Sequence, residues 1–177
     1  MRGQWIKSNR VTNFGDWGRV EYCPSGQHAI GVMVKYEEIG STNDHTGING
    51  IALLCAFRDG RPSPWTPTSS VAPWGEWKDC NCPEGRDYYL EGFQLCTLPP
   101  QGSGDDISAF AFYMVCHTFG VHYCLHKANL GDQYCSDLIM CPQEYPRICG
   151  IRTQVEDPPW YVHTDDTALN NVDFFCC

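Results

Sequence analysis

The sequence lacks several features that mark common protein classes. It has no run of about 18 apolar residues, so no segment is predicted to cross a membrane as a helix. It has 12 Lys and Arg against 21 Asp and Glu, a net charge of −9 and no basic stripe, so we expect no nucleic acid as a partner. The start, "MRGQWIKSNRV", has no apolar core of the signal-peptide type, which predicts a mature form if the protein is secreted.

Short catalytic and cofactor motifs are also missing. There is no Gly-x-Ser-x-Gly, P-loop, dinucleotide fingerprint or EF-hand spacing. No stretch combines a helical period with capping residues, which argues against α-helices. We therefore expect no cofactor, and the sequence favours a protein that is not an enzyme while leaving that question open.

Cysteine, in contrast, is abundant. The chain has 12 cysteines, an even number, and none of them forms a Cys-x-x-Cys pair of the kind that binds zinc. This pattern predicts disulfides in an oxidising, extracellular compartment rather than a metal site. All of the cysteines are expected to be bridged: Cys23, Cys55, Cys80, Cys82, Cys96, Cys116, Cys124, Cys135, Cys141, Cys149, Cys176 and Cys177.

One stretch occurs three times along the chain. "NDHTGINGIALLC" (43–55), "GDDISAFAFYMVC" (104–116) and "TDDTALNNVDFFC" (164–176) align without a gap, at a period of about 60 residues. In the second copy Ile107 and Phe110 replace the Thr and Asn of the third. Such a period indicates three related structural units.

Two further motifs recur in the same order. "WGRVEYCPSG" begins at Trp17 and "WGEWKDCNCPEG" at Trp74, and each contains a Cys-Pro pair. A third copy, "GDQYCSDLIMCP", ends in Cys141-Pro142 and lacks the tryptophan. Segments that open on Gly follow each Cys-Pro pair, at 31–37, 92–98 and 150–156. We therefore expect one domain, 1–177, with internal repeats at about 13–57, 73–117 and 130–177.

The apolar segment of each repeat alternates with period two, which is typical of half-buried strands. Gly and Pro clusters separate these segments as turns. The chain is therefore predicted to be all-β, with three similar sheets around an approximate threefold axis. One face of each strand should form the core: Ile51, Leu53, Cys55, Phe112, Met114, Cys116, Val172, Phe174 and Cys176.

Repeat spacing also suggests disulfide pairs. Each repeat has an early and a late cysteine, which predicts Cys23 with Cys55, Cys82 with Cys116, and Cys141 or Cys149 with Cys176 or Cys177. Cys124 with Cys135 would close the linker before the third repeat, and Cys80 with Cys96 is a further option. Spacing alone leaves these last pairings open.

The repeated Trp-Gly, Cys-Pro-x-Gly and "DDTALNNVDFFCC" motifs resemble the vitelline membrane outer layer protein I family over roughly residues 13–177. The resemblance implies a type I β-prism of three four-stranded Greek-key sheets. It implies a secreted protein of egg coats and other extracellular fluids. It also suggests a link to chito-oligosaccharides, and it supplies no catalytic residue.

The Asp pairs at 105–106 and 165–166 suggest glycoside hydrolysis, but neighbouring residues of an extended chain point in opposite directions. An Asp that binds turn amides before a strand is the simpler interpretation. Alternatively, the turns that precede the apolar strand in the three repeats converge on one acidic pocket for sugar hydroxyls or a cation. Its candidate residues are Asp44, Asp105, Asp165, Glu37 and Glu156.

Aromatic and histidine residues offer further candidates. Trp65 and Trp160 lie in Pro-flanked loops, where they could stack on sugar rings. The repeat tryptophans, Trp17, Trp74 and Trp77, are expected in core or corner packing. A zinc site at Cys124 with its neighbours His117, His122 and His126 is a disfavoured alternative, so we expect no metal.

The favoured function is a secreted structural or interaction protein of an extracellular coat or secretion, with coat or matrix proteins as partners. The alternative, from another class, is a carbohydrate-binding module with glycans as partners. A weak glycan-transferring enzyme is a third alternative. A glycan array that includes chitin oligomers separates the first two.

Overall fold

A computed structural model shows a protein built almost entirely of β-strands. It describes residues 2–37, 46–83, 87–102, 107–125, 130–156 and 167–177. Within these ranges there is no α-helix, and the only helical segment is the 3₁₀ turn η1 (Asp132–Tyr134). The strands are β1 (Gln4–Lys7), β2 (Asp16–Trp17), β3 (Glu21–Tyr22), β4 (Gln27–Tyr36), β5 (Ile48–Phe57), β6 (Glu76–Asn81), β7 (Leu90–Thr97), β8 (Ala109–Cys116), β9 (Gly120–Leu125), β10 (Ile139–Met140), β11 (Ile148–Glu156) and β12 (Ala168–Cys176).

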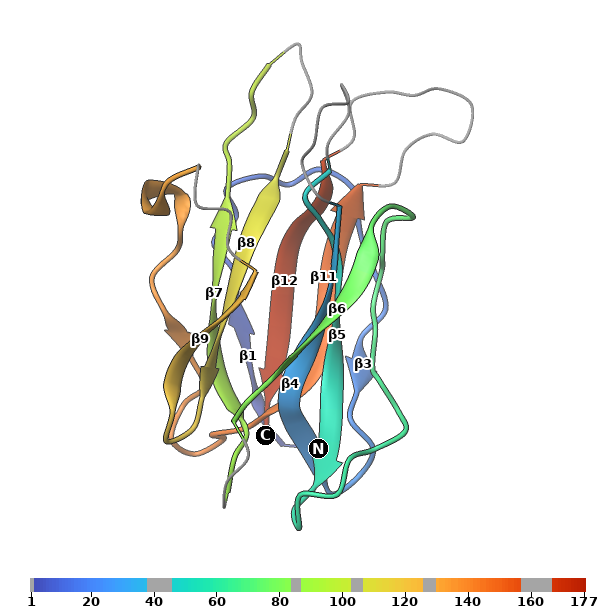
Figure 1. Cartoon of the computed structure of the whole chain (residues 1–177), viewed down its shortest axis with the longest axis vertical. Helices are drawn as coiled ribbons and strands as arrows, with labels where there is room; N and C mark the ends of the chain where they lie inside the picture. Colours follow the sequence, from blue (N-terminus) through green and yellow to red (C-terminus); the bar gives the residue numbers. More distant parts are fainter. Residues whose placement is uncertain (1, 38–45, 84–86, 103–106, 126–129, 157–166) are drawn as a thin grey trace.

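These strands form three antiparallel sheets around a shared centre (Figure 1). Sheet A has the order β1-β12-β11-β2, with β3 also paired to β11; sheet B is β5-β4-β6; sheet C is β10-β7-β8-β9. In sheet B, segment 62–68 lies beside β5 through the bridges Ala52–Thr68 and Ala56–Pro62, in the place of a fourth strand. The predicted all-β fold of three sheets is confirmed, and the arrangement is a β-prism.

Each sheet combines distant stretches of the chain. The first strand of one sequence unit pairs with the Gly-led strand of another: β6 with β4, β10 with β7, and both β2 and β3 with β11. β1 pairs with β12, where Gln4 lies opposite Cys176, so the two marked ends of the chain lie at the same end of the prism (Figure 1). The three sheets are therefore interlocked by exchanged strands.

The recurring glycines Gly31, Gly92 and Gly150 lie within β4, β7 and β11, where close contact with the exchanged strand requires them. A Cβ on Gly31 would lie 2.4 Å from the carbonyl oxygen of Cys80, and one on Gly150 would lie 2.6 Å from the ring of Tyr22. A register shift directly precedes the equivalent glycine in all three sheets, between the residue pairs Ala29/Gly31, Leu90/Gly92 and Ile148/Gly150. The recurring glycine thus marks a β-bulge against which the exchanged strand packs.

The predicted inward face forms the core where the three sheets meet. The nine residues expected there are all at most 3% exposed. Phe93, Phe112 and Phe174 pack together at its centre, with Phe174 edge-on to Phe93 at a centroid distance of 4.9 Å. Edge-to-face packing of this kind adds to the area that the rings bury. The period-two prediction is confirmed.

Six disulfides join the strands, and they leave no free cysteine. The predicted pairs Cys23–Cys55 and Cys82–Cys116 are confirmed, with sequence separations of 32 and 34 residues. The third equivalent pair is Cys141–Cys176, and Cys149 is bonded to Cys177. Each closed loop of this size stabilises the fold by about 4 kcal/mol through loop-closure entropy.

Two suggested pairings are wrong. Cys124 is bonded to Cys80, and Cys135 to Cys96, instead of Cys124 to Cys135 and Cys80 to Cys96. Cys80 belongs to β6 of sheet B and Cys124 to β9 of sheet C, so this bridge links two sheets. Spacing along the chain could not reveal it, because the strand exchange that sets β6 on sheet B is not encoded in the spacing.

The repeat tryptophans are not in the core, which was one of the two places expected for them. Trp17, Trp74 and Trp77 are 36%, 39% and 37% exposed. Trp17 and Trp77 belong to edge strands, with their rings on the outer surface of the prism, where Arg152 lies 4.6 Å above the ring of Trp17. Stacking on a guanidinium, rather than burial, accounts for Trp17.

The register of the Trp-Gly motif also differs from the alignment by sequence. Trp17 lies opposite Gln154, and Trp77 opposite Lys35, at equivalent places in sheets A and B. Trp17 therefore corresponds to Trp77 and not to Trp74. The same place in sheet C is filled by the bridged pair Cys96 and Cys135, which explains the missing tryptophan of the third repeat.

Candidate functional site

One corner of sheet B is closed by a hydrogen-bonded set of polar side chains. Glu37 follows β4 and Thr46 precedes β5, at the end of the prism remote from the chain ends. Thr46 Oγ1 donates to Glu37 Oε2 at 2.8 Å, and Asn49 Nδ2 donates to Thr46 Oγ1 at 2.7 Å and to the Gly47 carbonyl oxygen at 3.2 Å. These bonds tie the two strands together where the chain turns between them.

Sheet A repeats this corner. Thr167 Oγ1 donates to Glu156 Oε2 at 2.7 Å, and Asn170 Nδ2 donates to Thr167 Oγ1 at 2.6 Å. The Thr167 amide also donates to Glu156 Oε2 at 3.2 Å. The two corners differ at the amide oxygen: Asn170 Oδ1 accepts a bond from the Phe14 amide at 3.3 Å, whereas Asn49 Oδ1 is buried without a partner among the described residues.

Sheet C has an apolar version of the same corner. The positions of the Glu, Thr and Asn are taken by Leu98, Ile107 and Phe110, which are 8%, 9% and 2% exposed and pack together. All three polar residues are replaced as a set, because an unpaired buried polar group would be costly. The Thr and Asn of the repeated stretch therefore act as scaffold in two sheets.

The structure tests only part of the predicted acidic site. Asp44, Asp105, Asp165 and Trp160 lie outside the described residues. Glu37 and Glu156 each accept hydrogen bonds within their own corner, in two different sheets. Trp65 lies in the segment beside β5 and is 55% exposed, as expected of a loop aromatic residue. Whether the corners form one pocket stays a prediction.

The zinc alternative loses its thiolate, because Cys124 is bonded to Cys80. His117 Nδ1 lies 2.8 Å from Glu91 Oε2, and its ring stacks on Tyr89. Across the parts of the chain that the structure describes, no group of three His, Cys, Asp or Glu side chains could hold a metal ion.

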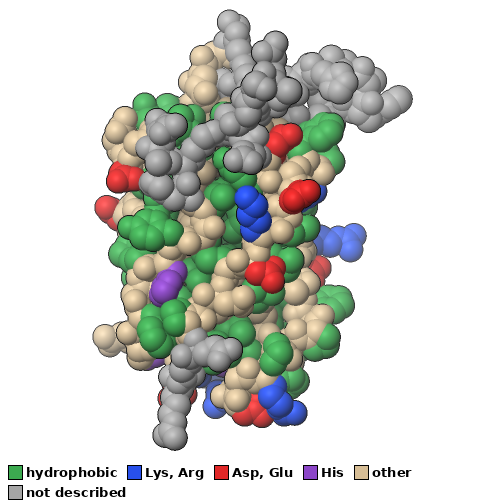
Figure 2. Space-filling view, in the orientation of Figure 1, with side chains coloured by type: hydrophobic (Ala, Val, Ile, Leu, Met, Phe, Trp, Pro, Cys, Tyr) green, Lys and Arg blue, Asp and Glu red, His purple; other side chains and the backbone are tan. Residues whose placement is uncertain are grey.

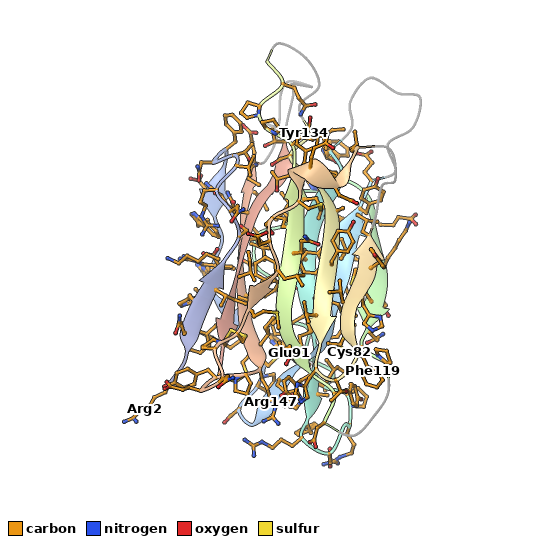
Figure 3. The ribbon with its side chains drawn as sticks, turned by 90° about the vertical axis from the view of Figure 1, so that its left-hand side faces the viewer. Arg2, Cys82, Glu91, Phe119, Tyr134 and Arg147 are labelled. Carbon is orange, nitrogen blue, oxygen red and sulfur yellow. A yellow bond between two sulfur atoms is a disulfide. The ribbon has the colours of Figure 1, made fainter. Side chains whose placement is uncertain are left out.

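Sequence reasoning missed a cavity of about 410 Å³ at the opposite end of the prism. It lies at the end of β4 where Gln27 begins the strand, beside the turn that follows β5. Figure 3 shows Arg147 at this end of the prism. The side chains that give it chemical character are His28, Phe57, Arg58, Asp87, Tyr89 and Arg147.

A stack of rings and a guanidinium forms one wall of this cavity. The Arg147 guanidinium carbon lies 4.6 Å from the Tyr89 ring centroid. The ring of His117 is stacked on Tyr89 at 4.4 Å with an angle of 10° between the planes. His28 meets Tyr89 edge-on at 6.0 Å. Tyr89 thus contacts both a guanidinium and an imidazole.

Burial and charge shift two titrating groups of the cavity. Burial lowers the pKa of His28 below its ordinary value, and the nearby Arg147 lowers this pKa further. Burial raises the pKa of Tyr89. His28 is therefore a neutral imidazole at pH 7, beside a permanent cation. No sequence signal pointed to this site, because its residues come from well-separated segments.

A second unpredicted cluster covers the outer face of sheet A. The side chain of Asp173 is 0% exposed, yet it lies on the face of β12 away from the core. Its oxygens bind Arg10 Nη2 at 2.6 Å and Arg152 Nη2 at 2.8 Å. Both guanidinium groups lie over the ring of Trp17, at 4.7 Å and 4.6 Å. The cluster buries a carboxylate under two paired cations and so has a structural role.

Charges are otherwise dispersed. On the face shown in Figure 2, acidic and basic side chains are scattered over a largely uncharged surface. In the described part of the chain, no helix has the length and apolar character needed to cross a membrane.

The comparisons with known proteins agree with this architecture. The sequence matches the family described as vitelline membrane outer layer protein I (VOMI) over residues 4–177. Vitelline membrane outer layer protein 1 homolog of Mus musculus is 33% identical over 171 residues, which is 94% of this chain and 81% of the mouse protein. The Homo sapiens homolog is 34% identical over 169 residues, 93% of this chain and 78% of the human protein.

Solved structures show the same fold at low sequence identity. Calsepa lectin, solved in complex with a bisected glycan, has a TM-score of 0.57 at 10% identity and covers 100% of this chain and 99% of its own. The mannose-binding lectin from Champedak has a TM-score of 0.54 at 8% identity, with the same coverage of both chains. These structures share the β-prism, and at such identity the likeness extends to the fold alone.

Proposed function

Because the chain belongs to the vitelline membrane outer layer protein I family, we propose that it is a secreted structural and interaction protein of an extracellular coat or secretion. Its partners would be coat or matrix proteins. The family name and the lectin-like fold support a vitelline-membrane-like or carbohydrate-binding role without choosing between them.

The observation that carries the structural role is the way in which disulfides close the prism. The Cys80–Cys124 bridge links sheet B to sheet C, and Cys149–Cys177 fixes the final strand at the chain end. Exchanged strands and bridges together leave few openings through which a protease could reach extended backbone. Rigidity of this kind suits a protein that must last outside the cell.

Fractionation of the producing tissue tests this proposal. We expect the protein in the extracellular coat or secretion, with no cysteine accessible to an alkylating reagent before reduction, and with slow proteolysis that speeds up after reduction. A protein found in the cytosol with free thiols would refute the proposal, because six disulfides persist only in an oxidising compartment.

The carbohydrate-binding alternative keeps its own candidate residues. The exposed ring of Trp65 favours it, since such a ring can bury the apolar face of a sugar. The other candidates are Asp44, Asp105, Asp165, Glu37, Glu156 and Trp160. Titration with chitin oligomers tests the alternative: binding that Trp65→Ala abolishes would support it, and no binding at millimolar ligand would refute it.

A further inference from the structure

The cavity at the chain-end side of the prism brings two arginines together beside two aspartates, Asp59 and Asp87. The net charge of the chain is −9, yet two arginines, Arg58 and Arg147, line this one cavity. A second hollow of about 280 Å³ shares both arginines and His28, and no described Asp or Glu lines it.

Neither arginine forms an ion pair within the part of the chain that the structure describes. Arg58 is exposed and makes no ion pair or hydrogen bond with any described residue. Arg147 stacks on Tyr89, and its Nε atom is buried without a hydrogen-bond partner. A guanidinium in a partly buried place favours an anion, and a carboxylate fits its fork in a bidentate manner.

The wall that carries Arg147 is rigid. The backbone amide of Arg147 donates to the carbonyl oxygen of Cys177 at 3.3 Å, and the Cys177 amide donates to the Arg147 carbonyl oxygen at 2.7 Å. Cys177 is in turn bonded to Cys149. The His117 ring stacks on Tyr89, and His117 Nδ1 lies 2.8 Å from Glu91 Oε2, which fixes the position of this ring. The site is therefore preorganised, which lowers the entropy cost of binding.

The other side chains that line the cavity determine which kind of anion fits it. Tyr89 and Phe57 offer aromatic surface, while the carboxylates of Asp59 and Asp87 can accept hydrogen bonds from hydroxyl groups. Asp59 also binds Arg61 at 2.8 Å, which leaves part of its acceptor capacity for a ligand. A ligand with a carboxylate, several hydroxyl donors and an apolar face satisfies all three kinds of lining. The volume of about 410 Å³ lies within the range of small-molecule sites.

We propose that this cavity binds a terminal acidic sugar, with the sugar carboxylate on Arg58 and Arg147, its hydroxyls on the Asp carboxylates and its ring against the aromatic wall. The site lies at the opposite end of the prism from the Glu–Thr–Asn corners and does not depend on them. It is also independent of the structural role proposed above, since a coat protein could hold or lack it.

Calorimetric titration of the full chain tests the proposal. N-acetylneuraminic acid, glucuronic acid, neutral galactose and sodium acetate are titrated in turn. We expect millimolar binding of at least one of the two acidic sugars and weaker binding of both galactose and acetate by at least about tenfold, or about 1.4 kcal/mol. The preferred acidic sugar identifies the source of the carboxylate.

Three variants place the binding in the cavity. Arg147→Gln and Arg58→Gln should each weaken the binding of the acidic sugar at least about fivefold, since each removes one charge-assisted contact. Lys78→Gln, which removes an exposed cation on β6 that does not line the cavity, should leave affinity within about twofold. Arg58 is exposed, so its variant tests the site even if Arg147→Gln fails to fold.

Three results would overturn the proposal. They are an absence of binding to both acidic sugars at tens of millimolar, equal affinity for acetate, and affinity that survives both Arg58→Gln and Arg147→Gln. None of these results bears on secretion or on coat association, which the fractionation experiment measures separately.

Discussion

Replacement of Thr46 by valine tests the interpretation of the polar corner. Valine keeps the shape of threonine and removes its hydroxyl, which donates to Glu37 at 2.8 Å and accepts from Asn49 at 2.7 Å. A hydrogen bond to a charged group contributes about 1.5–3 kcal/mol and a neutral one about 1 kcal/mol. Glu37 is half-exposed and regains water, so we expect a loss of about 2–3 kcal/mol in the free energy of unfolding.

The measurement is urea and thermal unfolding with all disulfides intact. A loss of that size should lower Tm by about 5–10 °C in a chain of this length. Thr167→Val should give a similar loss, because its two bonds have the same geometry in sheet A. Ile107→Val is the matched control at the apolar corner and should cost only about 1 kcal/mol, the ordinary effect of one buried methyl group.

A double-mutant cycle separates the bond from the local packing. Glu37→Met, which keeps the length of the side chain and removes its acceptor, combined with Thr46→Val should show a coupling free energy of at least about 1 kcal/mol, since the two side chains are in direct contact. If Thr46→Val costs less than about 0.5 kcal/mol, or if the coupling is zero, the corner does not stabilise the sheet and our reasoning is wrong.

Three further predictions concern the outer face, the bridges and the cavity. Asp173→Ala should lower the free energy of unfolding by about 3 kcal/mol in urea titrations, because it strands two paired guanidinium groups; a change below about 1 kcal/mol would contradict the structural role of the cluster. Replacing Cys80 and Cys124 together by serine opens a loop of 44 residues and should cost about 4 kcal/mol, measured in the same way; an unchanged midpoint would exclude this pairing. The folded-state pKa of His28 is lowered by burial and by Arg147, so the unfolded chain binds the extra proton more readily. Wild-type stability should therefore fall relative to His28→Gln as the pH drops from about 6.5 through the lowered pKa, and parallel pH profiles of unfolding would refute this.

Local patterns predicted the parts of the fold that depend on one strand. Alternation placed Leu53, Met114 and Phe174 in the core, because a strand shows one face to each side whatever its partner. The bridge between Cys23 and Cys55 followed from the repeat, since both residues belong to one sequence unit. The sequence indicated that the Glu–Thr–Asn corners occupy equivalent positions in the repeats. It did not indicate which of their atoms form hydrogen bonds.

The sequence did not predict the features that depend on contacts between different repeats. The exchanged strand of one unit packs on another sheet, so the partner of Cys124 and the outward position of Trp77 could not be read from either repeat alone. The cavity was missed for the same reason. Arg58 follows β5 and Arg147 precedes β11, and only the closure of the prism brings the two arginines to one place.

At one equivalent position on the outer edge of each sheet, different side chains hold the edge strand to its neighbour. An edge strand is held by few backbone bonds, so side chains that cross to its neighbour matter more there. In sheet A the place is held by Trp17 under a guanidinium, and in sheet B by Trp77 on β6, a strand of six residues. In sheet C the exchanged strand β10 has only two residues, and there the bond between Cys96 and Cys135 takes the place of the tryptophan. The bridge between Cys96 and Cys135 thus stands at the place where sheets A and B have a tryptophan, which is how the third repeat could lose its tryptophan and keep its place in the prism.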